Sequence, residues 1–309
     1  MVKSISLPNN PFISIVIPAM DLKVIRAINS ILRIKSSFSF EIIVIFNNCD
    51  YKVVERIIKI FYTQKNTGIL KIVYLTRSTI GGARNAGIKI ATGNYIIHMD
   101  SDCEVRNDYL KNISFVTQKE FLVARGDVLF FSSDNFLDIA NCKLRDFIYK
   151  TQKKICYTPN LIINIKLHKN GFIFDDKNLH GEDTELSIRF ERQAIYPIFL
   201  PEVIMFHKDE LKTLDIIKKY FYYGIARAYR FKKWNRKIVK YKFYQQLFGE
   251  INICSLKNIK PIIRLGILFL YFCRNMGVIY ACITHVFSND GDNKISELSS
   301  GKPVNIKKI

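Results

Sequence analysis

The residues that most clearly suggest chemistry are two aspartates, Asp100 and Asp102, with Ser101 between them. They follow the run 95–99, whose composition predicts a buried strand. In extended backbone, residues i and i+2 point the same way, so both carboxylates can face one divalent cation while Ser101 faces away. Hard oxygen ligands of this kind suit Mg²⁺ or Mn²⁺ carrying a diphosphate. The pattern therefore predicts a metal site at the end of a strand.

Context distinguishes this pair from a second Asp-x-Asp at residues 290–292. The second pair lies in a polar tail rich in Ser and Lys, with no strand before it, which predicts a solvated loop. The first pair follows the turn sequence 92–94 and an apolar run. Functional side chains are commonly placed at such strand ends, so we expect the metal only at Asp100 and Asp102.

Composition limits the class of protein. A chain of 309 residues with 49% hydrophobic content can form one large α/β domain plus an appendage, and it is neither disordered nor fibrous. Seven scattered cysteines without a Cys-x-x-Cys pair argue against a disulfide framework and a zinc ribbon. Residues 1–8 lack the long apolar segment of a secretory signal, so we expect a cytoplasmic protein.

Positive charge is concentrated in the last third of the chain. Of the net charge of +20, residues 208–309 contribute +13, from 20 Lys and Arg against 7 Asp and Glu. Between Lys218 and Lys242, ten basic residues alternate with aromatic ones and no acidic residue occurs. Such a segment attracts anions, and the candidates are a lipid surface or nucleic acid.

Apolar runs alternate with amphipathic segments along the first 207 residues. Strands are expected at 13–17, 41–46, 70–75, 95–99, 121–131, 160–164 and 195–207, and helices at 24–33, 53–61, 82–90 and 138–154. This order predicts an α/β fold with a Rossmann-like, mostly parallel sheet flanked by helices, which binds ligands at the carboxyl edge of its strands. We divide the chain into a catalytic domain, 1–210, and a basic, aromatic and apolar helical extension, 211–309.

The segment 262–287 is the one apolar stretch of membrane length. Arg264 and Arg274 interrupt it, and its longest uncharged part is shorter than a membrane span of roughly 20 residues. We expect an interfacial helix whose arginines reach lipid headgroups. The residues expected to enter the acyl boundary are Leu265, Leu268, Phe269, Phe272 and Met276. Ordinary core packing and a true span remain as alternatives.

Four motifs together give the chain a resemblance to family 2 glycosyltransferases of the GT-A fold, of the bacterial surface-polysaccharide type. They are ISIVIP at 13–18, GARNAG at 82–87, ATGNYIIHMDSD at 91–102 and HGEDTELSIR at 180–189. Each motif is loose, but they occur in the family's order and at its spacing over residues 12–207. The resemblance implies a GT-A catalytic domain followed by a membrane-proximal helical extension.

The resemblance also implies an activity. It is the metal-dependent, inverting transfer of a hexosyl or N-acetylhexosaminyl group from a nucleoside diphosphate, with UDP favoured, to a glycan or lipid-linked acceptor. Asp102 would ligate Mn²⁺ or Mg²⁺, and Asp100 would contact the ribose or the water shell of the metal. His207, after an apolar run, resembles the histidine that completes the metal site in many relatives. A plain loop histidine is the alternative.

Further positions match the family's donor and acceptor residues. Pro18 would lie at the nucleoside-binding edge, and Arg84 near the donor, with Ser101 inside the metal motif. Asp183 matches the general base that deprotonates the acceptor. A helix starting near Thr184 would help to keep the Asp183 carboxylate ionised. Simple helix capping is the alternative role for Asp183.

One position departs from the family pattern. Relatives usually place an acidic residue at the end of the second strand to receive the base of the nucleotide, and here Phe46 and Asn47 stand there. Phe46 cannot accept a hydrogen bond. The amide of Asn47 offers a donor and an acceptor, so it could pair with a uracil or thymine edge.

Two other functions remain open at this point. A nucleic-acid- or lipid-binding protein with a degenerate GT-A site would explain the basic segment, but Asp100, Asp102 and Asp183 would repel a polyanion, so nucleic acid is not favoured. A GT-A-like nucleotidyltransferase would share the metal site and release pyrophosphate. We expect a glycosyltransferase held at the cytoplasmic face of the cell membrane by peripheral contact through residues 218–287.

Overall fold

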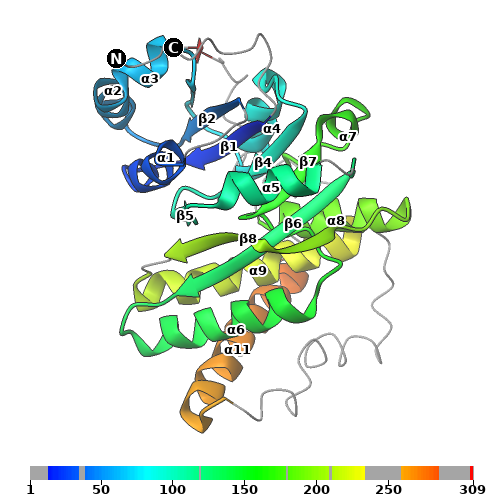
Figure 1. Ribbon diagram of the computed structural model, residues 1–309. Coiled ribbons are helices and arrows are strands. Elements are labelled where there is room, and N and C mark those ends of the chain that lie inside the picture. The colour runs from blue at the N-terminus through cyan, green and yellow to red at the C-terminus, as the bar shows by residue number, and fades with distance from the viewer. Residues whose placement is uncertain are drawn as a thin grey trace.

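The computed structural model describes residues 13–34, 39–117, 120–178, 180–208, 211–233, 259–284 and 307–308. In this part of the chain, helices flank one nine-stranded sheet of order β5-β8-β6-β7-β4-β1-β2-β3-β9 (Figure 1). The strands are β1 (Ile13–Ala19), β2 (Phe40–Asn47), β3 (Leu70–Leu75), β4 (Tyr95–His98), β5 (Cys103–Val105), β6 (Val123–Phe131), β7 (Leu161–Asn164), β8 (Ile198–Lys208) and β9 (Lys307–Lys308).

The N-terminal half of the sheet is parallel, in the order β4-β1-β2-β3. Ile15 of β1 lies opposite Ile42 of β2 and Ile97 of β4, in register with the rest of these strands. The strands are buried on both faces, which explains why they are continuous apolar runs. The helices of this half are α1 (Val24–Leu32), α2 (Tyr51–Ile60), α3 (Tyr62–Asn66) and α4 (Ile80–Ile90). The predicted α/β class is confirmed.

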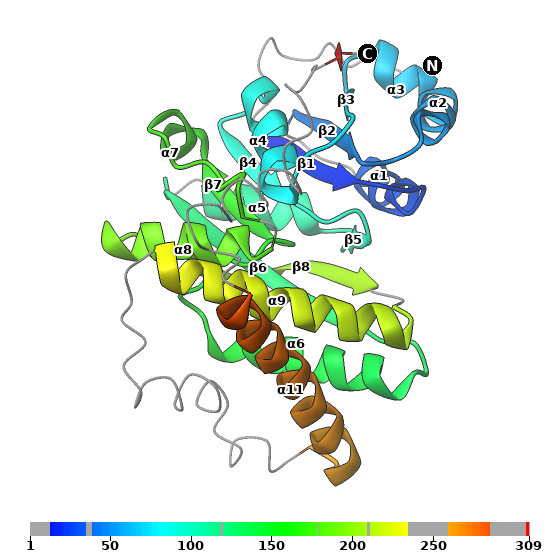
Figure 2. The same cartoon turned by 180° about the vertical axis from the view of Figure 1, so that it is seen from behind.

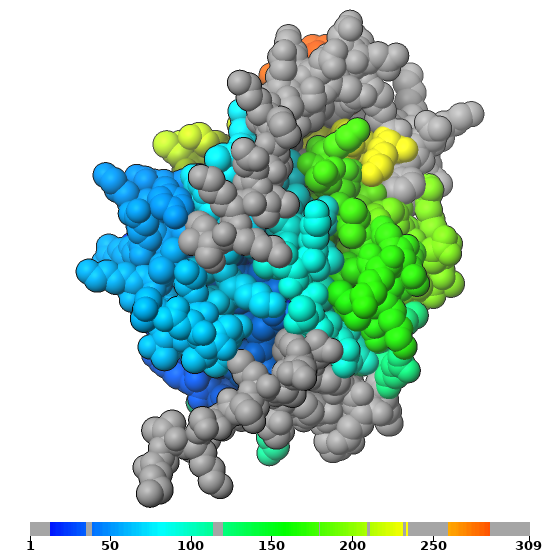
Figure 3. All heavy atoms as spheres, turned by 90° about the horizontal axis from the view of Figure 1, so that it is seen from above, coloured from blue at the N-terminus to red at the C-terminus, as the bar shows by residue number. Residues whose placement is uncertain are grey.

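The second half of the sheet mixes directions. Strand β7 is antiparallel to both β4 and β6, β6 runs parallel to β8, and the short strand β5 is antiparallel to β8. The associated helices are α5 (Tyr109–Thr117), α6 (Phe136–Thr151), α7 (Ile165–Lys169) and α8 (Glu182–Arg192). In the space-filling view, the blue and cyan first half and the green second half are in direct contact and form one continuous body (Figure 3). Strand β5 has only three residues, too few for a recognisable pattern in the sequence.

Two long helices, α9 (Thr213–Lys233) and α11 (Pro261–Ile283), complete the described structure. Both pack on α6, and all three lie side by side on one side of strands β6 and β8 (Figures 1 and 2). Their apolar cluster includes Leu144, Ile216 and Leu270, which come from the three helices in turn. The division near residue 210 stays a prediction. The second Asp-x-Asp at 290–292, residues 1–8, 234–242 of the basic segment and 285–287 of the apolar one lie outside the described residues.

Helices α9 and α11 touch backbone to backbone at Gly224 and Gly277. A Cβ built on Gly224 would lie 1.9 Å from the carbonyl oxygen of Arg274, and one built on Gly277 would lie 2.0 Å from that of Phe221. Real Cβ atoms do not approach backbone oxygen this closely, so each position requires glycine. The close crossing fixes which faces of the two helices are buried.

We expect Gly224→Ala to destabilise the protein by about 1–3 kcal/mol, because the added methyl group must separate two packed helices. The loss should exceed the gain in helix propensity that alanine normally brings. Chemical denaturation monitored by circular dichroism measures the change. Leu214→Ala, at an exposed position of α9, is the control and should have little effect. Equal stability of Gly224→Ala and wild type would contradict the close crossing.

Candidate active site and metal centre

Asp100 and Asp102 lie in a tight turn that directly follows β4. The backbone N–H of Cys103 donates to the carbonyl of Asp100 at 3.1 Å, so the backbone is not extended as the sequence argument assumed. Both carboxylates nevertheless approach the same imidazole. The Nε2 atom of His207 lies 3.4 Å from Asp102 Oδ1 and 3.8 Å from Asp100 Oδ2. The turn, and not the strand, brings the two aspartates together.

Strand pairing places His207 beside this turn. In the antiparallel pair of β5 and β8, Cys103 lies opposite His207. The backbone N–H of Lys208 also donates to the carbonyl of Asp102 at 3.1 Å. His207 is only 2% exposed, so its ring has little freedom to turn away. The alternative of an unconstrained loop histidine therefore does not describe this residue.

The donor set fits a hard divalent cation. Ligand atoms of Asp102, Cys103 and His207 all lie within 4.8 Å of one another. In an octahedral Mg²⁺ site, adjacent ligands lie about 3 Å apart, close to the 3.4 Å between Asp102 and His207. Burial, and then the charges of Asp102 and Asp100, raise the pKa of the Cys103 thiol well above its usual value. Cys103 therefore stays a neutral thiol, and the oxygen and nitrogen ligands suit Mg²⁺ or Mn²⁺.

Arg84 links the metal motif to the second acidic motif. Its guanidinium is 1% exposed, donates to Asp100 Oδ1 at 2.7 Å and forms an ion pair with Glu182. Burial alone would lower the pKa of Arg84, but the charges of Glu182 and Asp100 outweigh it and the pKa is raised. For Asp100, burial would raise the pKa, but His207 and Arg84 together lower it. Both groups therefore remain charged.

The close packing of α4 on the sheet positions Arg84. A Cβ on Gly87 would lie 2.5 Å from a methyl group of Val16 and 2.7 Å from one of Ile45, so only glycine allows the helix to approach β1 and β2 this closely. Arg84 precedes Gly87 by three residues, on the same face of the helix. Gly81 and Gly82 lie in the first turn of α4, which begins at Ile80.

Asp183 is the second residue of α8, and it does not cap that helix. The N-cap is Gly181, with φ of 74° and no side-chain cap hydrogen bond. The Asp183 Oδ1 atom instead accepts from the backbone N–H of Thr184 at 2.6 Å. Burial, followed by the charge of Glu182, raises the pKa of Asp183 to about 6. The helix start was expected to favour the ionised form; the backbone hydrogen bond from Thr184 does lower the pKa of Asp183, but burial and Glu182 outweigh it.

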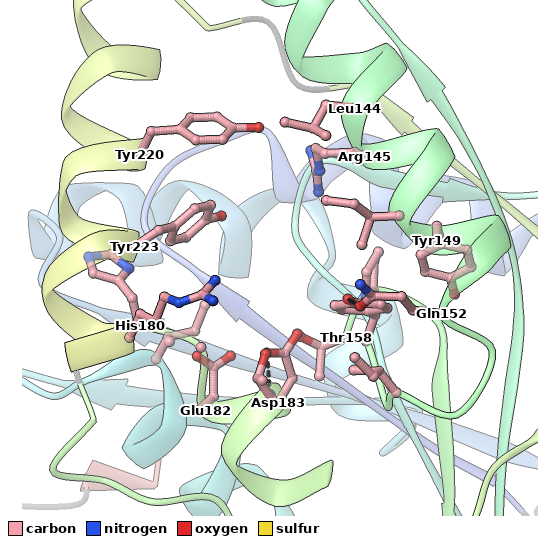
Figure 4. Close-up of a pocket in the computed structure, with 18 of the residues that line it drawn as sticks. Leu144, Arg145, Tyr149, Gln152, Thr158, His180, Glu182, Asp183, Tyr220 and Tyr223 are labelled. Carbon is pink, nitrogen blue, oxygen red and sulfur yellow. Dashed lines mark hydrogen bonds between the residues drawn. The ribbon is translucent and has the colours of Figure 1, made fainter. Parts of the chain in front are cut away.

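A cavity of about 350 Å³ connects these groups to the C-terminal helices. Arg84, Asp100, Glu182 and Asp183 line one end of the cavity, and residues of α6, α9 and α11 line the other. Figure 4 shows Glu182 and Asp183 pointing into the space between Tyr220 and Tyr223 of α9 on one side and α6 on the other. A carboxylate with a pKa near neutrality, facing such a cavity, can accept a proton from a bound hydroxyl.

Helix α9 also contacts the loop that precedes α8. Arg230 donates to the carbonyl of His180 at 3.2 Å, and the ring of Tyr222 lies 5.6 Å from that of His180. Lys233 forms ion pairs with Asp175 at 2.8 Å and with Glu185 at 2.9 Å. The C-terminal helices therefore help to fix the position of Asp183.

Three residues predicted for donor binding lie outside this cavity. Pro18 is partly exposed at the carboxyl end of β1, and Ser101 is partly exposed in the turn. The side-chain N–H of Asn47 donates to the carbonyl of Ser78 at 2.8 Å, while its Oδ1 atom is buried without a hydrogen-bond partner among the described residues. One N–H of the Asn47 amide is thus already used, and its second N–H and its carbonyl remain for a base.

Sequence reasoning placed Arg84 near the donor but missed four other arginines of the cavity. Arg145 of α6 approaches the Nε2 atom of His207 at 3.1 Å. Arg227 and Arg230 of α9 and Arg274 of α11 line the cavity with Tyr220 and Tyr223. Helical spacing could have identified part of this group, because positions 220, 223, 227 and 230 share one helix face. Residues 218–242 were instead interpreted together, as one segment that attracts anions.

Comparisons with known proteins agree with this geometry. Residues 14–170 match the sequence model described as Glycosyl transferase family 2. A curated relative from Haemophilus influenzae, described as an uncharacterized glycosyltransferase, is 27% identical over 222 residues, which is 68% of this chain and 74% of the relative. The fold is similar to that of the mannosyltransferase PcManGT from Pyrobaculum calidifontis, solved in complex with GDP-Man and Mn²⁺. The TM-score is 0.55 at 12% identity, over 95% of this chain and 77% of that one.

The raised pKa of Asp183 predicts that Asp183→Asn is more stable than wild type at pH 7. The pKa is about 6 in the folded protein and 3.8 in an exposed carboxyl group. As pH rises from 4 to 6, the unfolded chain loses this proton before the folded one, so wild type loses up to about 3 kcal/mol of stability. The neutral amide avoids this loss.

Unfolding by denaturant at pH 4 and pH 7 measures the difference. The gain should be present at pH 7 and should be small at pH 4, where the folded carboxyl group is protonated and the unfolded one is close to half protonated. Asp215→Asn, at an exposed position of α9, is the control and should show neither effect. A gain that is the same at both pH values would contradict the raised pKa.

Proposed function

The chain belongs to glycosyl transferase family 2, and we propose that it is a metal-dependent, inverting glycosyltransferase. The donor is a nucleoside diphosphate sugar, and the acceptor is a glycan or a lipid-linked saccharide in surface-polysaccharide synthesis. The observation that supports this most strongly is the convergence of Asp100, Asp102 and His207 beside the cavity that contains Asp183. A metal centre and a carboxylate base at one cavity are what sugar transfer from a diphosphate requires.

On the donor side, Asp102, His207 and Asp100 are the residues that would hold Mn²⁺ or Mg²⁺. When bound, such an ion supplies positive charge that stabilises the departing diphosphate. Arg84 keeps Asp100 ionised and in place through the 2.7 Å ion pair. The structural relative with GDP-Man and Mn²⁺ supports the choice of metal and makes GDP a donor to test beside UDP.

On the acceptor side, Asp183 accepts the proton of the attacking hydroxyl. The new bond forms between that oxygen and the sugar, while the electron pair of the old C–O bond leaves with the diphosphate. This single displacement inverts the configuration of the sugar and needs one base. Glu182 and Asp100 both form ion pairs with Arg84, so neither competes with Asp183 as a base or serves as a second nucleophile.

The nucleoside and sugar follow from weaker observations. The buried carbonyl of Asn47 can accept the N3–H of uracil if the loop opens by a small movement, which keeps UDP as the favoured carrier. The volume of about 350 Å³ admits a hexosyl or N-acetylhexosaminyl group. The apolar and basic surface described next favours a lipid-linked acceptor.

The outer face of α11 supports peripheral membrane contact. Along this helix the large apolar side chains at successive turns are exposed, with Leu265 at 61% and Phe272 at 59%. The others on this face are Ile262, Leu268, Phe269, Met276, Ile279 and Ile283. This exposed row includes all five residues expected to enter the acyl boundary. Exposed apolar surface of this extent marks an interaction site.

Helix α11 of the described chain is long and apolar enough, by length and composition, to cross a membrane. Its inner face nevertheless packs on α6 and α9 through Ile267 and Leu270, and its Arg274 lines a polar cavity. A helix that spans the bilayer would have to leave these contacts. We therefore propose that α11 lies in the interface at the cytoplasmic face of the membrane, with Arg264 near the headgroups.

Donor binding and catalysis should separate in two variants. Asp102→Asn should abolish the Mn²⁺-dependent stabilisation by a nucleotide, because it removes a metal ligand, whereas Asp183→Asn should retain this stabilisation and lose transfer. Thermal unfolding with UDP, GDP, dTDP and CMP, with and without Mn²⁺, measures binding. A ligand at 100 times its dissociation constant stabilises a protein by about 2.7 kcal/mol.

Asp215→Asn is the control for the removal of one carboxylate, and it should behave as wild type. Sugar transfer by Asp183→Asn at the wild-type rate would exclude Asp183 as the base. Release of pyrophosphate from a nucleoside triphosphate, in place of a nucleoside diphosphate from a sugar nucleotide, would identify a nucleotidyltransferase.

Membrane contact is testable with the double variant Leu265→Ser and Phe272→Ser. Sedimentation with vesicles containing anionic lipid should fall at least about tenfold, because two large side chains are lost from the apolar face. Donor hydrolysis should be unchanged. Leu122→Ser, an exposed leucine away from α11, is the control. Full vesicle binding by the double variant would show that this face contacts something other than lipid.

A further inference from the structure

The wall of the cavity that helices α6, α9 and α11 form is strongly basic. Four arginines from three helices line it: Arg145 of α6, Arg227 and Arg230 of α9, and Arg274 of α11. With Arg84, the described residues of the lining include five arginines against three carboxylates, Asp100, Glu182 and Asp183. Arg84 lies between two of these carboxylates. The carboxylate that remains, Asp183, lines the same cavity as the four arginines of the three helices.

Two of the four arginines serve the catalytic end of the cavity. Arg145 approaches His207 at 3.1 Å, and its guanidinium lies 4.5 Å from the centre of the Phe130 ring. Arg230 donates to the carbonyl of His180, next to the start of α8. These contacts place both guanidinium groups beside the metal motif and the base, where they add positive charge.

The other two arginines, Arg227 and Arg274, come from the two helices that cross at Gly224 and Gly277. The guanidinium of Arg274 lies over the ring of Tyr271, 4.3 Å from its centre, and this stacking keeps the planar group at the wall. The backbone carbonyl of Arg274 lies against Gly224. Arg274 is therefore level with a point on α9 about one helical turn before Arg227. Both arginines are partly exposed in the part of the chain that the structure describes.

Two tyrosines of the cavity lining use their hydroxyl groups within the protein. The hydroxyl of Tyr220 donates to Asn141 at 3.1 Å, and that of Tyr149 donates to the carbonyl of Gly126 at 2.8 Å. Both rings are buried. Both hydroxyl donors are directed to the protein, so the charged donors on this wall are the guanidinium groups.

We infer that this wall binds a phosphate or diphosphate group of the acceptor, held chiefly by Arg227 and Arg274. The inference rests on the proposed function and names the acceptor class. Guanidinium groups match phosphate oxygens in pairs, and several cations around one cavity repel one another until an anion offsets their charge. Phosphate held here would leave a neighbouring sugar hydroxyl free to reach Asp183 at the other end of the cavity.

A phosphate at this position can belong to a lipid-linked saccharide or to a free sugar phosphate. The arginine on α11 is Arg274, and the opposite face of the same helix carries the exposed apolar row that includes Phe272. A lipid tail could therefore follow the outer face of α11 while its phosphate enters the cavity. Both sources share the same phosphate chemistry at the arginines.

Binding of phosphate probes to the full chain tests this inference. The protein is first saturated with Mn²⁺ and the nucleotide that stabilises it, so that the donor site is occupied. Titration calorimetry then measures binding of farnesyl phosphate, farnesyl diphosphate and glucose 1-phosphate, with farnesol as the neutral probe. Each of Arg227→Gln and Arg274→Gln should weaken phosphate binding at least about tenfold, because each removes a charged hydrogen bond.

Arg192→Gln, at an exposed position of α8, removes the same charge outside the cavity and should bind the probes as wild type does. Mn²⁺-dependent nucleotide binding should be unchanged in all three variants, which also shows that they fold. Tighter binding of the farnesyl probes than of glucose 1-phosphate would assign the phosphate to a lipid; the reverse would assign it to a soluble sugar phosphate.

Other outcomes would overturn the inference. If Arg227→Gln and Arg274→Gln lose nucleotide binding instead, the arginines hold the donor diphosphate. Equal binding of farnesol and farnesyl phosphate would show that the wall does not recognise phosphate. If wild type binds nucleotide but no phosphate probe, the acceptor class is wrong while the proposed function stands. If wild type binds no nucleotide, the proposed function itself fails.

Discussion

The site depends on one buried ion pair network, in which Arg84 contacts both Asp100 and Glu182. These residues come from the first turns of α4, the turn after β4 and the start of α8. Loss of one partner from a buried charge pair costs on the order of 3–5 kcal/mol, because it leaves a charge without compensation. The network therefore holds the Asp100 turn and the start of α8 at a fixed separation. The glycine at position 87 makes it possible by letting α4 approach the sheet.

The same network determines the chemistry of Asp183. Glu182 faces Arg84, and its negative charge, together with burial, raises the pKa of the neighbouring Asp183 to about 6. A carboxylate with this pKa accepts a proton more readily than an exposed one and is still ionised at neutral pH. The cost is a folded state that is less stable at pH 7 than it would be with a neutral side chain. Destabilising electrostatic interactions of this kind are common at functional sites.

The C-terminal helices form part of the site. Helix α9 contacts the loop before Asp183 through Arg230 and supplies cavity-lining side chains, and α11 carries a polar inner face and an apolar outer one. The close crossing at Gly224 and Gly277 sets the rotation of both helices. The basic and aromatic residues of α9 were expected to contact an external anionic surface, and they are instead divided between the cavity and the outside of the protein. This division connects the exposed apolar surface of α11 to the cavity that contains Asp183 over the width of one helix.

The sequence by itself determined the fold class and the family, because the order of buried strands, amphipathic helices and the motifs around Asp100 and Asp183 is local information. It also identified the apolar row of α11 from its spacing. Only the tertiary structure decided how these parts meet. The turn that orients Asp102 and the three-residue strand that sets His207 opposite Cys103 are too short to form a pattern in the sequence. The ion pairs of Arg84 join residues that are distant in sequence. The upward shift of the Asp183 pKa follows from burial, and the inward orientation of Arg227 and Arg274 follows from the helix crossing. Both causes exist only once the chain has folded.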